Sequence, residues 1–533
     1  MMTLVLRNES QTIRTSSTCA VALALLTMTF LAGASQLAKG QTGDDALRIA
    51  QRAPGQTAKN LGLGGTGVAG VVDASAFFSN PAGLGWSDKS WFSGSVTSII
   101  AKDEGVFQAP GSIGSREEEV TSVGLGNLSY LFKIPTMRGA MVVGASISEV
   151  SSFERGLFFD GDNNANSITD FFIPFSDEFF LEDDGDGGVF PSFDRTLSFI
   201  GFETFAIDLD QDLVDAGDPV PFRAAVSAGT IVQTGFVEES GRMMELNVGG
   251  AIEVSKDVMI GASINVPFGT YKFHRVLEED DFLNDNDGTG GTTDFAFLSF
   301  SERFESEIVG ANLRVGISAQ VNENLRLGAS VETPTYYSIE DNFSTRLHTE
   351  FDNGDFYSYG GDSSERAGTG TFDYNVTTPW KLSLGASYES GDLKLLADVD
   401  WIDWSQLELD SDGFSFDDEN LAIKQSLDAV VNVRVGASYD FNAWQFRIGA
   451  GAYQDPRGSI LGSAAVATVD RERTYASGGV GYKISDKINV DIGWMAEKFD
   501  DRYDLYTTEV TDAPFVLEEV TRHTVKIGLS FSL

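Results

Sequence analysis

The sequence of 533 residues predicts an all-β fold: a 14-stranded antiparallel transmembrane β-barrel with an N-terminal hatch, or plug. Segments of about ten residues alternate apolar with small or polar side chains, tight polar turns join them in pairs, and long acidic loops separate the pairs. The tight turns are Pro135–Gly139, Ser255–Asp257, Asn322–Asn324, Ser390–Asp392, Asp440–Ala443 and Ser485–Lys487. Six tight turns on one side of a barrel leave seven loops on the other, which predicts fourteen strands.

Residues 1–40 are predicted to be a secretory signal peptide. Arg7 and Arg14 precede an apolar run from Cys19 to Leu31, about 13 residues long, which is too short to span a bilayer as a helix. The only cysteine lies in this segment, so we expect neither a disulfide nor a lipid anchor in the mature chain. Export combined with alternating strands predicts a place in the outer membrane of a Gram-negative-type cell.

Residues 41–90 are predicted to form the hatch, because they are rich in glycine and do not alternate, yet are too apolar for a disordered tail. The run Gly62–Gly67 has the spacing of a dinucleotide-binding loop, but no strand precedes it. We interpret these glycines as allowing tight folding of the backbone inside a wide barrel. Candidates for an apolar ligand pocket, or equally for packing of the plug against the wall, are Leu61, Leu63, Val68, Phe77 and Phe78.

Residues 91–533 are predicted to form the barrel wall. In Leu313–Val321 the odd-numbered residues are apolar and belong toward lipid, whereas the even-numbered ones are small, polar or charged and belong toward the lumen. The lumen phase contains Arg314 and Arg434 as well as several acidic residues, so internal salt bridges are the expected arrangement. Binding of a ligand carboxylate by one of these two arginines is the alternative.

Two long external loops are predicted, at 154–241 and 277–302. Residues 223–238 could form a further strand, but that strand would make the strand number odd. We therefore assign them to the first loop, with helical content expected around Arg223–Ile231. The same loop contains the phenylalanine-rich run 171–180, which predicts either a packed loop core or a landing site for an apolar ligand.

The formal charge of -42 makes nucleic acid an unsuitable partner. The acidic residues concentrate in the loops, which indicates adaptation of an exposed surface or, at Asp285 and Asp287, binding of Ca²⁺. We expect no other cofactor. The three histidines are isolated and there is no Gly-x-Ser-x-Gly motif, so the sequence does not predict an enzyme.

Several motifs resemble a known family. Asn80-Pro81-Ala82-Gly83-Leu84, together with Gly62–Gly67 and residues 397–405, is similar to sequences of the FadL/TodX-type outer-membrane transporters of long-chain fatty acids and aromatic hydrocarbons. The resemblance implies a fourteen-stranded barrel whose hatch carries the Asn80, Pro81 and Ala82 motif and moves to let a hydrophobic small molecule pass. It also implies exit into the lipid of the outer membrane through an opening in a kinked third strand.

In this chain that strand would be 140–153, where Gly144 is the expected point of weak pairing. Some barrels of this type resemble partners of secretion machines. A barrel that serves a protein secretion system and binds exported proteins is therefore the alternative function.

Overall fold

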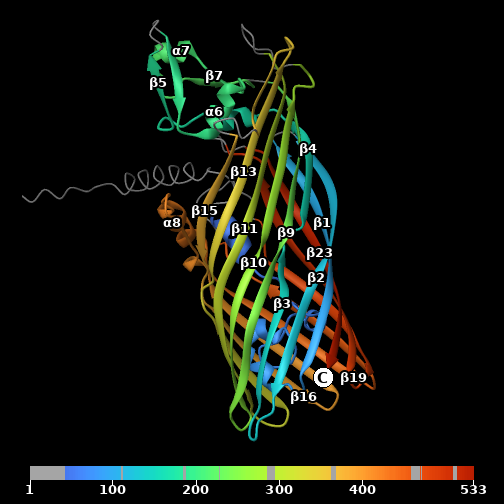
Figure 1. Cartoon of the computed structure of the whole chain (residues 1–533). Helices are drawn as coiled ribbons and strands as arrows, with labels where there is room; N and C mark the ends of the chain where they lie inside the picture. Colours follow the sequence, from blue (N-terminus) through green and yellow to red (C-terminus); the bar gives the residue numbers. More distant parts are fainter. Residues whose placement is uncertain are drawn as a thin grey trace, which may run out of the picture.

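The computed structural model describes residues 42–109, 112–183, 188–226, 229–284, 294–361, 368–457, 469, 471–507 and 513–533. The predicted signal peptide, at 1–40, lies outside these ranges, as do Asp285 and Asp287. The described chain forms a long, closed antiparallel barrel with a helical segment inside it and a small folded loop at its outer end (Figure 1). No helix in the described ranges is long and apolar enough to cross a membrane.

The barrel has fourteen transmembrane strands, as predicted, and three of them consist of two consecutive pieces. They are β1 (Trp91–Ala109), β2 (Ser112–Ile134), β3 (Met141–Ser152) with β4 (Arg155–Asn163), β9 (Ile231–Ser255), β10 (Val258–Asp280), β11 (Phe295–Gln320), β12 (Leu325–Glu332) with β13 (Tyr336–Phe351), β15 (Thr369–Thr377) with β16 (Lys381–Ser390), β17 (Leu393–Asp403), β19 (Ala429–Phe441), β20 (Trp444–Tyr453), β21 (Arg473–Ser485), β22 (Ile488–Asp504) and β23 (Phe515–Ser532). Because β1 pairs with both β2 and β23, the sheet closes and has no free edge.

The turns and the wall follow the predicted chemistry. Four of the predicted tight turns contain a residue with positive φ, namely Gly139, Asp257, Gly391 and Asn442. Along β11, Leu313, Val315 and Ile317 are about half exposed on the outer surface, whereas Asn312 and Arg314 are buried inside. The outer surface also exposes the aromatic side chains Trp380, Tyr388, Trp401, Tyr439 and Trp444, which fits an interfacial girdle.

The external loops are shorter than expected. Residues 231–238 are the outer end of β9 and not a helix, because they pair with β4 on one side and β10 on the other. Within Arg223–Ile231 the described residues include the end of a short strand and no helix, so that expectation is wrong. The first loop therefore spans 164–230 instead of 154–241, and the second spans 281–294 instead of 277–302. The even strand number was right because 231–255 is one strand.

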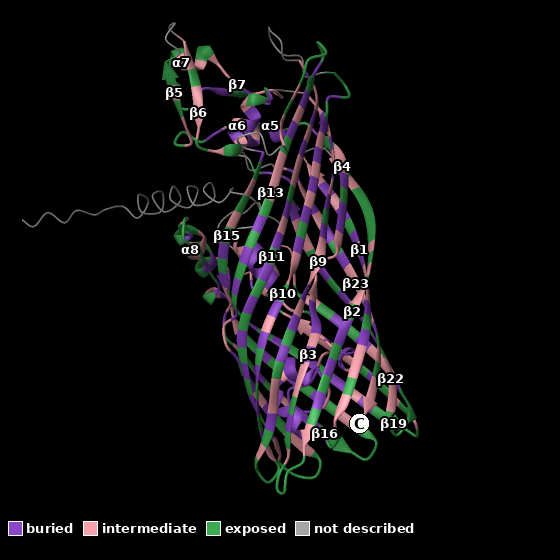
Figure 2. Cartoon of the chain, in the orientation of Figure 1, coloured by how far each residue is buried: buried purple, intermediate pink, exposed green. Residues whose placement is uncertain are grey.

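The loop 164–230 has its own small fold. It contains α5 (Ile168–Phe171), β5 (Phe179–Asp183), β6 (Val189–Phe193), α6 (Thr196–Glu203), β7 (Ile207–Leu209), α7 (Gln211–Ala216) and β8 (Phe222–Ala224). Phe172 is fully buried, and its ring lies 5.4 Å from that of Phe300 on β11. Phe180 remains half exposed. Of the two interpretations of the phenylalanine-rich run, the packed loop core applies to the base of the loop. Figure 2 shows more exposed residues toward the tip of the loop.

Two further strands and one helix lie in the connections at the outer half of the wall. These elements are β14 (Phe356–Gly360), β18 (Glu408–Asp410) and α8 (Asp417–Ser426), with the 3-10 turn η2 (Trp404–Gln406) before β18. Helix α8 contacts the start of the plug, since Gly43 lies against Ile423.

Residues 42–90 fill the lumen. They form α2 (Gly43–Ala50), α3 (Ala58–Gly62), α4 (Ala76–Ser79) and the 3-10 helix η1 (Pro81–Trp86), drawn in blue within the barrel in Figure 1. Gly62 approaches the backbone of Gly479, and Gly64 approaches that of Gly449. These close approaches between glycine backbones place the Gly62–Gly67 run directly against the inner wall, where a side chain on either partner would not fit.

Candidate functional site

The Asn-Pro-Ala motif attaches the plug to the wall. Asn80 is fully buried and caps η1, because its Oδ1 accepts a hydrogen bond of 3.0 Å from the amide of Ala82. Its Nδ2 donates to the carbonyl of Val68 in the plug at 2.8 Å and to that of Ile317 on β11 at 2.9 Å. One side chain therefore joins two plug segments to one strand. Gly316 makes room for it, since a Cβ there would overlap the amide of Asn80.

A wall carboxylate holds the glycine-rich turn. Oδ2 of Asp398 on β17 accepts hydrogen bonds from the amides of Gly67 at 2.6 Å and Val68 at 3.1 Å. Lys394 on the same strand donates to the carbonyl of Gly70 at 2.7 Å. The plug thus makes polar contacts with two parts of the wall, at β11 and at β17, with two transmembrane strands between them.

Buried ion pairs make a third attachment. Arg52 of the plug lies 2.6 Å from Oε1 of Glu332 and 3.1 Å from Oε2 of Glu245, both on the wall. Arg314 lies 2.8 Å from the other oxygen of Glu332 and also donates to the carbonyl of Phe77. The predicted internal salt bridge of Arg314 is therefore present, and this arginine holds the plug rather than facing an open space.

A cavity of about 230 Å³ lies between the outer part of the plug and the wall. Its lining includes Phe78 and Ser79 from the plug and Phe153, Trp404 and Phe499 from outside the plug. Of the other predicted pocket residues, none lines this cavity: Leu61 packs with Tyr475, Leu63 packs with Leu396, and Val68 and Phe77 are buried between plug and wall.

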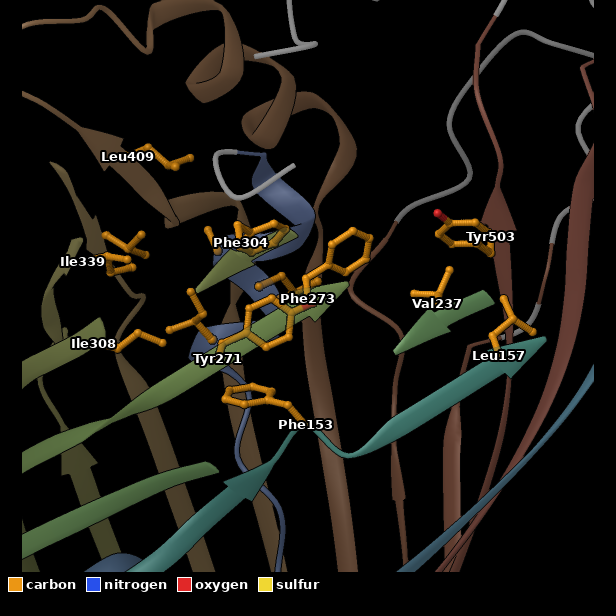
Figure 3. Packing of buried hydrophobic residues seen from close by; sticks show 14 of the residues in the cluster. Phe153, Leu157, Val237, Tyr271, Phe273, Phe304, Ile308, Ile339, Leu409 and Tyr503 are labelled. Atoms are coloured by element: carbon orange, nitrogen blue, oxygen red, sulfur yellow. The ribbon is translucent and has the colours of Figure 1, made fainter. Parts of the chain in front are cut away.

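An aromatic cluster, shown in Figure 3, borders the cavity through Phe153. The ring of Phe153 meets that of Tyr271 edge-on at 5.0 Å, Tyr271 lies 5.5 Å from Phe304, and Phe304 stacks on Phe273 at 5.0 Å. These rings are buried against one another, and Phe153 is the member of the cluster that lines the cavity.

The cavity is rich in cations although the protein is strongly acidic. Among the described residues, its lining has nine basic and six acidic side chains. Arg434 is neutralised by a bidentate contact with Asp400 at 2.6 and 2.9 Å. Arg473 has no ion-pair partner in the described ranges and lies over the ring of Phe499 at 4.7 Å. The nearest acid to Arg522 is Glu497, 4.0 Å away.

Arg473 therefore has no acidic partner in the described wall, and Arg522 has only the long contact to Glu497 and a hydrogen bond of 3.5 Å to the carbonyl of Glu154. The Nε of Arg522 is buried and lacks a hydrogen-bond partner in the described part of the chain. A carboxylate with an apolar tail fits such a cavity, since it would pair with the two guanidinium groups while the tail contacts the aromatic side chains. Our sequence reasoning missed both arginines, although the alternation that places Lys526 in the lumen also places Arg522, four residues earlier, on the same face.

The wall has a gap beside the cavity, between the second and third strands. β3 pairs with β2 only as far as Ser148 opposite Asn127, and its continuation β4 pairs with β9 but not with β2. The pairing between β3 and β9 shifts register between Glu149 and Ser151. Gly144, in contrast, is regularly paired on both sides, so the expected weak point lies higher in the strand than predicted.

No group of three or more His, Cys, Asp or Glu side chains in the described ranges is arranged to hold a metal ion. Because Asp285 and Asp287 lie outside these ranges, Ca²⁺ binding there stays a prediction.

Comparisons with known proteins agree with this architecture. Residues 236–510, just over half of the chain, match the family model described as outer membrane protein transport protein (OMPP1/FadL/TodX). A FadL homologue from Pseudomonas aeruginosa superposes with a TM-score of 0.52 at 12% identity, covering 90% of this chain and 99% of that one. The toluene transporter TodX from Pseudomonas putida gives a TM-score of 0.48 at 12% identity, with the same coverage. The first of these shows a shared fold. No curated protein sequence matches the chain.

Proposed function

The chain belongs to the OMPP1/FadL/TodX family of outer membrane transport proteins, and from that basis we propose that it imports hydrophobic molecules bearing a carboxylate, with long-chain fatty acids as the fitting class. Its place is the outer membrane, and it is a transport protein and not an enzyme. The observation that carries the choice of substrate is the excess of basic side chains around the cavity between plug and wall.

Two properties of the cavity support a fatty acid over a neutral aromatic hydrocarbon. An alkyl chain gains about 0.8 kcal/mol for each methylene that leaves water, and aromatic side chains of the cavity lining such as Phe153 and Phe499 provide apolar surface for it. A hydrocarbon without a charge would leave Arg473 without a counter-ion and Arg522 with only its 4.0 Å contact to Glu497, which is unfavourable for partly buried cations. A carboxylate satisfies both groups.

We also propose that the ligand leaves sideways through the gap between β2 and β3. The cavity lining includes Ser151, Ser152 and Phe153, which belong to the strand bordering the gap. On the outer surface, Val123 and Leu125 of β2 are exposed at the same level, within the apolar band of the wall. A molecule leaving the cavity here would enter lipid without crossing water.

Binding measurements in detergent test the choice of substrate. We expect the purified protein to bind oleate at least tenfold more tightly than oleyl alcohol, and toluene weakly, because only the first carries a charge. The double variant Arg473→Ala/Arg522→Ala should lose the preference for oleate, whereas Arg447→Ala, which removes a lumen arginine paired with Asp491 at 2.6 Å, should retain it. Equal affinity for the acid and the alcohol would refute a carboxylate ligand.

The same preparation examines the alternative function. Native mass spectrometry of protein extracted from its own membrane should show bound alkyl carboxylates. A co-purifying exported protein in place of small molecules would favour a role in protein secretion.

A further inference from the structure

One arginine from a neighbouring strand occupies the gap in the wall. Arg242 of β9 lies opposite Ser152 of β3 in the sheet, beside the register shift. Its Nη2 donates to Oγ of Ser122 on β2 at 2.9 Å and lies 3.4 Å from the carbonyl of Val123. The side chain therefore crosses the outer part of β3 and reaches β2, the strand that β3 has left.

A carboxylate of β3 completes the contact. Nη1 of Arg242 lies 3.5 Å from Oε2 of Glu149, which is 7% exposed although its neighbours on that face of the strand point outward. Arg242 itself keeps about a third of its side-chain surface accessible. The guanidinium thus bridges β2 and β3 where their backbone hydrogen bonds are absent.

The sequence of β2 makes room for this bridge. A Cβ at Gly124 would overlap the guanidinium of Arg242, so only glycine is compatible with the observed position. Gly126 is left out of the pairing between β1 and β2, where the register shifts at Ser95 and Val96. β2 is therefore shaped around the arginine at the height of the gap.

We infer that Arg242 is the latch of the lateral opening: its guanidinium closes the gap at rest and must leave Ser122 and Glu149 before a ligand passes between β2 and β3. This inference rests on the proposed sideways exit. A side chain suits this purpose better than backbone pairing, because a few hydrogen bonds to a partly exposed arginine can break and reform while the backbone pairing of β2 with β3, from Met141 to Ser148, stays intact.

The latch predicts that its removal speeds passage. We expect Arg242→Ala to raise the initial rate of oleate uptake by about two- to fivefold, since contacts of a partly exposed arginine have that equilibrium value. Gly124→Ala keeps Arg242 in the sequence, but the added methyl group would displace its guanidinium, so this variant should also raise uptake. The double variant should be no faster than the faster single one, because both changes act on one contact.

Lys102→Ala is the matched control. Lys102 pairs with Glu117 at 2.8 Å across β1 and β2, strands that are hydrogen-bonded along their whole length. Its loss should leave uptake unchanged. Hydrogen–deuterium exchange supplies a readout that is independent of transport: amides of 122–127 and 148–154 should exchange faster in Arg242→Ala and not in Lys102→Ala.

The outcomes separate the latch from the function on which it rests. If cells carrying the wild-type protein take up no more oleate than cells without it, the proposed import fails. If the wild type imports oleate and Arg242→Ala imports it at the same or a lower rate, the latch is refuted whatever the exchange data show. Faster uptake in both single variants, with faster exchange beside the gap, supports it.

Discussion

Replacing Asn80 by alanine probes how the plug controls the pathway. The change removes two hydrogen bonds donated by Nδ2, to Val68 and Ile317, and one accepted by Oδ1 from Ala82. Each buried hydrogen bond contributes about 1 kcal/mol net, so the attachment of the plug should weaken by roughly 3 kcal/mol. That value raises the population of plugs detached at this point by about a hundredfold, because 1.4 kcal/mol corresponds to a factor of ten.

The barrel should stay folded, because none of the lost bonds is a backbone hydrogen bond between strands. The one lost bond that reaches the wall joins Asn80 to the carbonyl of Ile317. We expect unchanged heat-modifiable migration in gels and faster hydrogen–deuterium exchange of residues 66–86. Uptake of oleate should fall severalfold, because Phe78 and Ser79, which precede Asn80, line the cavity and would lose their position.

A control variant calibrates the magnitude. Ser330→Ala removes one hydrogen bond, of 2.6 Å, from Ser330 Oγ to the carbonyl of Ser79. It should weaken the attachment by about 1 kcal/mol and raise exchange correspondingly less. Equal exchange of residues 66–86 in Asn80→Ala and the wild type, or unchanged uptake, would contradict the assignment of this motif as the anchor of the hatch.

Three further predictions follow from single contacts. Glu279, at the outer end of β10 beyond the membrane, accepts hydrogen bonds from the base of loop 164–230, and burial raises its pKa from the usual 4.5 to about 7. The protonated Glu279 therefore stabilises docking of the loop fully below about pH 4.5, and this stabilisation is lost as the pH rises through 7. Proteolysis of the loop should accordingly be faster at pH 8.5 than at pH 5.5. The variant Glu279→Gln should remove most of that difference. Gly316→Ala should displace Asn80 and reproduce the uptake defect of Asn80→Ala; wild-type uptake would show that the close contact is not required. Arg314→Leu leaves buried carboxylates without their partner and should lower the free energy of unfolding by about 3–5 kcal/mol in denaturant titrations; a loss below about 1 kcal/mol would mean that Arg52 alone balances them.

The parts of the fold that depend on neighbours in sequence could be predicted. Leu313 and Arg314 face opposite sides of the wall because consecutive residues of a strand must do so. The tight turn at Asp257 carries a left-handed residue because a short hairpin connection requires one. The even strand number followed from the same local signals.

The parts that depend on distant partners were missed. The sequence assigns residues 231–238 to a loop because a separate strand there would make the strand number odd, yet β4 and β10 pair with them on both sides and make them the outer end of β9. Glycine content pointed to Gly144 as the weak point, but the pairing between β2 and the third strand ends after Ser148, where β4 pairs with β9 and β2 keeps only β1 as a partner.

The sequence by itself determined a closed barrel, its inner and outer faces, its turns and a stopper of glycine-rich chain, because alternation and turn chemistry act over a few residues. Only the tertiary structure decided which charged groups meet. Arg314 pairs with Glu332 of the wall and holds the plug, whereas Arg473 and Arg522 line the cavity without a close acidic partner. Arg242 lies between β2 and β3 where their backbone pairing has ended. Barrel closure and strand register bring together residues hundreds of positions apart, and a sequence pattern of a few residues cannot predict such contacts.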